Sequence, residues 1–150
     1  MKINGSTDAS VAAGQISSKG HNLRASIYRA MNRIQVGLQS LIISKLQGPV
    51  LQHRSGKLTG SVRGQVEDHG DMISAVVTAG GGVAPYAAVH EYGGTFQIPD
   101  HLSHSKRGRA FTVRAHSATF PERSFMRSSL TEFRSRAEAE LAKAAIEGLK

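Results

Sequence analysis

Residues 22–46 read NLRASIYRAMNRIQVGLQSLIISKL, and this stretch decides the fold. Apolar side chains recur every three or four positions and fall on one stripe of a helical wheel, with Arg29 and Arg33 on the opposite side. The pattern predicts a long amphipathic helix over about 22–46. Glycine and proline at positions 48 and 49 are typical of a helix end. The stripe consists of Leu23, Ile27, Ala30, Met31, Ile34, Leu38, Leu41 and Ile42.

A second helical pattern lies at the C-terminal end of the sequence. Proline and glutamate at positions 121 and 122 suit a helix N-terminus, where the backbone dipole favours negative charge. Apolar side chains then cluster on one arc of the wheel, which predicts a helix to about residue 147. The arc consists of Met126, Leu130, Phe133, Ala137, Leu141 and Ala144.

Between the helical patterns the apolar period changes to two, which is typical of strands. Residues 61–66 and 72–79 flank a short turn-forming segment and predict an antiparallel hairpin. Residues 84–94 favour a short helix over a strand, because Tyr86, Val89 and His90 would then share one face.

Two further strands are predicted, at residues 95–98 and 109–116. In the second of them the alternation places Phe111, Val113 and Ala115 inward. Residues 99–108 between them are polar and basic, and predict a mobile loop.

This order predicts an α+β domain in which a long N-terminal helix and a C-terminal helix pack on an antiparallel sheet, with a short central helix. Residues 1–20 are rich in Ser, Gly, Ala and Thr without an apolar period, and predict a flexible N-terminal arm. Residues 21–150 then form a single domain, and a hydrophobic content of 39% suffices for one modest core.

The charge is strongly positive and unevenly placed. Nineteen Lys and Arg stand against eleven Asp and Glu, which gives a net charge of +8, and no acid lies between Asp8 and Glu67. A second acid-free interval, between Asp100 and Glu122, holds four basic residues. Such tracts favour DNA or an acidic protein face as partner, with a solvated basic surface as the alternative. The candidate basic residues are Arg24, Arg29, Arg33, Lys106, Arg107 and Arg109.

The sequence offers little for catalysis. With no cysteine, it excludes disulfides, thiolate zinc sites and cysteine nucleophiles. His101 and His104 resemble a ligand pair, and His90 with Glu91 would add to it, but neighbouring Lys and Arg repel a cation. No nucleophile elbow, carboxylate pair or phosphate-binding loop is present. We expect no enzymatic activity, no cofactor and no metal.

No apolar run is long enough to cross a bilayer and no signal-peptide pattern begins the sequence, so we expect synthesis in a cytoplasm and no membrane contact. The basic tracts show no stacking platform of aromatic residues, no helix-turn-helix pattern and no zinc finger, so no dedicated nucleic-acid-binding motif is predicted.

Three blocks of the sequence together resemble phage tail-completion proteins. They are residues 54–63 (RSGKLTGSVR), 84–95 (APYAAVHEYGGT) and 120–130 (FPERSFMRSSL), in which Met126 replaces the leucine usual in the family. The order and spacing of the blocks resemble those of the Mu-like phage virion morphogenesis proteins, minor tail protein Z and related tail components. The similarity covers residues 20–145.

The resemblance implies a non-enzymatic structural subunit that forms a homo-oligomeric ring of six copies at the virion neck or the head-proximal end of the tail. Implied partners are copies of itself, adjacent neck, connector and tail-tube proteins, and DNA in the lumen, first in the host cytoplasm and then in the virion. A tail terminator that caps the tube is an alternative within the family. A basic DNA-binding accessory protein is the alternative of another class.

A ring subunit needs interface anchors, and aromatic and arginine side chains commonly serve as such. The candidates are Tyr86, His90, Glu91, Tyr92, Arg123, Phe125 and Arg127. For Tyr86 and Phe125 the sequence leaves a second interpretation equally open, namely ordinary core packing between the short helix and the last helix.

Overall fold

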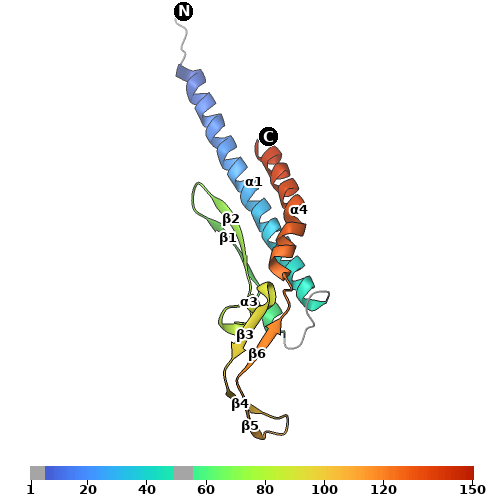
Figure 1. The fold of residues 1–150 in the computed structure, drawn as a ribbon. Coiled ribbons are helices and arrows are strands. Elements are labelled where there is room, and N and C mark those ends of the chain that lie inside the picture. The colour runs from blue at the N-terminus through green and yellow to red at the C-terminus, as the bar shows by residue number, and fades with distance from the viewer. Residues whose placement is uncertain (1–5, 49–55) are drawn as a thin grey trace, which may run out of the picture.

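The computed structural model describes residues 6–48 and 56–150, and its fold is α+β as predicted (Figure 1). Two long helices, α1 and α4, run side by side, and a β1–β2 hairpin lies against α1. The elements are α1 (Ser6–Gln47), α2 (Lys57–Gly60), β1 (Arg63–Asp68), β2 (Ile73–Thr78), the 3-10 turn η1 (Gly81–Val83), α3 (Ala87–Tyr92), β3 (Gly94–Ile98), β4 (His101–His104), β5 (Ala110–Val113), β6 (His116–Phe120) and α4 (Phe125–Gly148).

The predicted start of the first helix, near residue 22, is wrong. α1 is 42 residues long and begins at Ser6, so most of the segment expected to be an arm is helical. Its composition is rich in alanine, which has the highest helix propensity of all residues. Gly148 at the end of α4 lies against Leu23, and residues 15–22 of α1 are exposed beyond that contact. Residues 1–5 lie outside the described residues.

The core lies where the C-terminal half of α1 meets the other elements. Ile42 and Leu46 pack there with Val62 and Ala87, around the fully buried Phe125. The predicted stripe of α1 therefore faces the core as expected. The arc of α4 does so only in part, because Phe133 and Ala144 are buried while Leu130 and Leu141 are exposed. Among the partly buried side chains around this core are Leu38, Ile43, Leu58, Val77, Ala79 and Met126.

The strands form three separate two-stranded antiparallel sheets rather than the single sheet expected. The predicted β1–β2 hairpin is confirmed, with Arg63 opposite Thr78 and Asp68 opposite Ile73. Residues 99–108, predicted to be a loop, contain β4, which pairs with β5. The predicted strand over 109–116 is divided into β5 and β6, because each half pairs with a different partner strand.

The prediction that Phe111 and Ala115 point inward is wrong: Phe111 is 49% exposed, and Ala115 is exposed between β5 and β6. Within the described residues, β4 and β5 pair only with each other. The predicted loop before β1 ends in the short helix α2, and its positions 52–55 lie outside the described residues. No helix of the described ranges is long and apolar enough to cross a membrane.

Candidate assembly interface

The junction between α3 and the start of α4 gathers all seven predicted interface residues. α3 follows a proline and ends at Gly93, and its residues Ala87 and Glu91 are buried. The backbone N–H of Arg123 donates to the carbonyl of His90 over 2.9 Å, and that of Ser124 donates to the carbonyl of Glu91 over 3.3 Å. Two sequence blocks some thirty residues apart are thereby joined, and we call this region the α3–α4 junction.

Glu91 closes the N-terminus of α4. Its carboxylate accepts the backbone N–H of Met126 over 2.8 Å and that of Arg127 over 2.9 Å. Ser124, the residue at the usual capping position, makes no side-chain cap and has a positive φ of 28°. A carboxylate at this place satisfies unpaired helix donors and interacts favourably with the helix dipole. Glu91, 5% exposed, therefore serves the fold and is not available to a partner.

Arg127 lies on the exposed side of the junction. Its Nε donates to Glu91 Oε1 over 3.2 Å and one Nη donates to Glu122 Oε1 over 2.6 Å. Its guanidinium lies 4.9 Å from the centre of the exposed Tyr92 ring. These contacts hold a charged group and an aromatic ring together at the surface, which suits an interface anchor.

The prediction that Phe125 belongs to an assembly interface is wrong. It is fully buried in the core, so the core interpretation holds for this residue. Tyr86 is half-buried and meets His90 edge to face, with 5.7 Å between ring centres, as the predicted shared face requires. Of the seven candidates, Tyr92 and Arg127 are the ones left exposed.

His90 gives the junction a pH dependence. Burial lowers the pKa of His90 below its ordinary value of about 6.5, and the nearby Arg123 lowers this pKa further. The unfolded chain then binds a proton more readily than the folded one, so this histidine contributes stability above about pH 6.5 that is lost as the pH falls.

We therefore expect the thermal midpoint of His90→Gln to fall less than that of the wild type between about pH 7 and pH 5. Circular dichroism melts at a series of pH values measure this difference. His104→Gln is the matched control, because His104 is exposed on β4 and should leave the wild-type profile unchanged. Equal slopes for wild type and His90→Gln would contradict the assignment.

The predicted basic surface is less open than the sequence indicates. Arg24 forms an ion pair with Asp68 of β1, and Arg33 Nε donates to Glu140 of α4 over 2.8 Å. Arg29 donates to its own helix neighbour Ser26. The three arginines of α1 therefore do not form a continuous row of free charges. Lys106, Arg107 and Arg109 are exposed in the β4–β5 turn, far along the molecule from these arginines (Figure 1).

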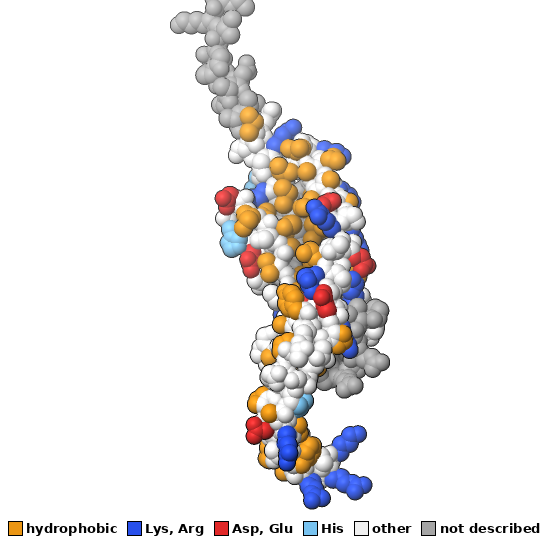
Figure 2. All heavy atoms as spheres, in the orientation of Figure 1, with side chains coloured by type: hydrophobic (Ala, Val, Ile, Leu, Met, Phe, Trp, Pro, Cys, Tyr) orange, Lys and Arg blue, Asp and Glu red, His pale blue; other side chains and the backbone are white. Residues whose placement is uncertain are grey.

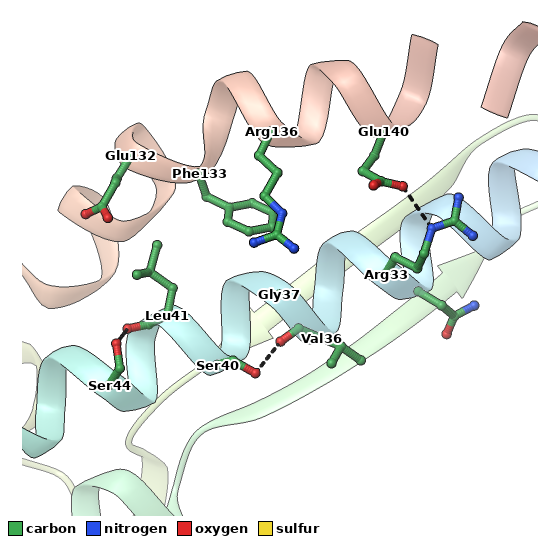
Figure 3. A pocket seen from close by; sticks show the side chains of 11 residues that line it. Arg33, Val36, Gly37, Ser40, Leu41, Ser44, Glu132, Phe133, Arg136 and Glu140 are labelled. Atoms are coloured by element: carbon green, nitrogen blue, oxygen red, sulfur yellow. Dashed lines mark hydrogen bonds and ion pairs between the residues drawn. The ribbon is translucent and has the colours of Figure 1, made fainter. Parts of the chain in front are cut away.

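A groove of about 890 Å³ runs between α1 and α4 (Figure 3). Gly37 faces Phe133 on its floor, where a Cβ would come within 2.6 Å of the ring. Val36 and Leu41 add apolar surface, and the ion pair between Arg33 and Glu140 lies beside them. This ion pair also lowers the pKa of Glu140.

The groove shows no catalytic arrangement in its described lining. Ser40 donates to the carbonyl of Val36 and Ser44 to that of Leu41, so both hydroxyls are bonded to their own helix rather than to a base (Figure 3). Within residues 6–48 and 56–150, no three His, Asp or Glu side chains are grouped as a metal site requires. His101 and His104 are three residues apart in a strand, so they point to opposite faces.

The cap formed by Glu91 was not predicted from the sequence. Helix caps are normally predicted from the residues just before a helix, and Glu91 lies far earlier in the chain.

No family model, curated protein or solved structure matches the chain.

Proposed function

We propose that the protein is a non-enzymatic structural subunit of a phage virion, which forms a homo-oligomeric ring at the neck or the head-proximal end of the tail. Its partners are further copies of itself and the adjacent neck and tail-tube proteins. The α3–α4 junction is the observation that carries the proposal. Two of the three sequence blocks that resemble tail-completion proteins meet there, and Glu91 of one block caps the helix that begins in the other.

Exposed apolar side chains support assembly. Tyr92 at the α3–α4 junction is 63% exposed, and Leu102 on β4 is 66% exposed. Apolar surface that gathers in exposed patches is typical of protein–protein interaction sites. A subunit that contacts a neighbour on each side would cover such side chains.

Deletion of the gene from its phage tests the proposal, with plasmid-borne wild-type protein as the complementing control. We expect electron micrographs to show filled heads and separate tails of normal length, and complementation to restore joined virions. Tails of irregular length would instead assign the role of tail terminator, because a cap that stops tube growth would be missing. Complete, infectious virions without the protein would overturn the proposal.

A further inference from the structure

The segment from residue 94 to residue 120 projects from the helical body as a β-ribbon (Figure 1). β3 pairs with β6 from Gly94 opposite Phe120 to Ile98 opposite His116. β4 continues the first strand and pairs with β5 from His101 to His104. Neither pair has a third strand within the described part of the chain. We call residues 94–120 the ribbon.

One face of the β3–β6 pair is largely apolar, and Phe96 on it is 39% exposed. Phe96 and Ile98 share a face with Ala118 and Phe120, and the two phenyl rings lie 6.1 Å apart. The opposite face is polar there, and the hydroxyl groups of Thr95 and Thr119 are hydrogen-bonded to each other over 2.9 Å. Further out, Leu102 and Phe111 are 66% and 49% exposed, and they lie on opposite faces of the β4–β5 pair. An isolated two-stranded ribbon is at best marginally stable in water, so these side chains need a neighbour.

The tip of the ribbon is basic. Lys106 and Arg107 lie in the turn between β4 and β5, and Arg109 follows it. The turn has a defined shape, because the backbone N–H of Ser105 donates to the carbonyl of Arg109 over 2.9 Å and the N–H of Arg109 donates to Ser105 Oγ over 3.1 Å. Asp100 is the single acid in the ribbon, against four Lys and Arg.

A matching acidic turn lies at the end of the β1–β2 hairpin. Glu67, Asp68 and Asp71 fall within five residues there, beside His69. Asp68 is already paired with Arg24 of the same subunit, so Glu67 and Asp71 are the acids left to attract a partner. Figure 2 shows acidic side chains at this hairpin and basic side chains gathered at the far end of the ribbon. The two turns are thus separated in one subunit and opposite in charge, which attracts the tip of one copy to the hairpin of another.

We propose that the ribbon of one subunit docks on the next copy of this chain, with its basic tip against the acidic β1–β2 turn and its apolar face on the helical body. The inference rests on the proposed ring and names the surfaces that form it. Since the tip and the turn are different patches, the contact is head to tail, and such a contact forms a ring where the rotation between successive copies closes. The ribbon and its docking surface account for part of the area that the free subunit leaves exposed.

Charge reversal tests the pairing in full-length protein by sedimentation velocity. Arg107→Glu with Arg109→Glu, and separately Glu67→Lys with Asp71→Lys, should each weaken self-association by about tenfold or more. One chain that carries all four substitutions should assemble again. A mixture of the two double variants should also assemble, because each tip then meets an opposite turn. Lys19→Glu with Lys143→Glu carries the same charge change as the tip variant but places it on the helices, and it should assemble like the wild type.

Several results would overturn the inference. They are a monomeric wild type at all concentrations, tip variants that assemble normally, and a fourfold variant that stays dissociated although circular dichroism shows it folded. Tip variants that lose binding to duplex DNA without a change in assembly would assign the tip to nucleic acid instead. The deletion experiment distinguishes these results from failure of the proposed function, since it reads virion assembly without reference to the ribbon.

Discussion

Glu91→Gln is expected to lower the free energy of unfolding by about 2 to 4 kcal/mol. The substitution keeps the size of the side chain but removes the charge that two backbone N–H groups of α4 and Arg127 share. One of the two amide ends then presents a donor to another donor at a buried site. Because the helix dipole also favours a negative charge at this place, the loss should exceed that of an ordinary hydrogen bond. Urea unfolding followed by circular dichroism measures the change.

Glu138→Gln is the matched control. Glu138 accepts Arg134 Nε over 2.9 Å in an exposed pair one helical turn apart, and such pairs contribute little to stability. We expect a change of less than about 0.5 kcal/mol. Similar losses for the two variants would show that the Glu91 cap is no more than a surface contact, and the α3–α4 junction would lose its structural role.

The helices and the first hairpin could be predicted because the apolar period and the turn residues that mark each element lie within it or next to it. The stripe on α1 is long, and its burial against α4 and the β1–β2 hairpin keeps the 3.6-residue period visible in the sequence. The short helix α3 was marked by a proline before it and a glycine pair after it. These signals lie within the element or next to it.

The ribbon could not be predicted in the same way. An alternating pattern indicates a buried face, and the prediction that Phe111 points inward assumed a covering layer that the described residues do not form. Residues 99–108, which include Ser103 and Ser105, have the polar composition typical of a loop, although β4 lies there. If another copy of the chain supplies the covering layer, the sequence period within one copy does not reveal which face of the ribbon that layer covers.

The interface role predicted for Glu91 and Phe125 is wrong because both are buried, whereas that of the exposed Tyr92 and Arg127 stays a prediction. The sequence grouped Glu91, Phe125 and Arg127 as interface residues, and they do lie together. Phe125 and Glu91 are buried because α4 starts against α3, and that contact joins positions thirty or more residues apart. Local sequence patterns do not reveal such a contact, because it depends on how distant segments pack in the folded chain.

Gly93→Ala is expected to be severely destabilising, by about 3 kcal/mol or more. Gly93 has φ 62° and ψ −164°, a conformation that is essentially restricted to glycine. A Cβ there would lie 2.5 Å from the backbone nitrogen of Glu122 and 2.8 Å from the carbonyl oxygen of Phe120. Neither atom belongs to a flexible side chain, so the chain leaving α3 would have to move away from the end of β6.

Gly70→Ala separates the effect of the positive φ from the effect of close packing around the added Cβ. Gly70 also has a positive φ, of 89°, but a Cβ there meets no atom within 4 Å, so its substitution should cost only about 1 kcal/mol of backbone strain. Equal losses in the two variants would show that close packing at Gly93 contributes nothing. Because Gly93 lies where the ribbon leaves the body, its variant should also expose Lys106, Arg107 and Arg109 to faster cleavage by trypsin than the Gly70 variant does. Faster cleavage would indicate that the turn at Gly93 holds the base of β3 and β6 in place, and through it the orientation of the tip that we propose to dock on the next copy.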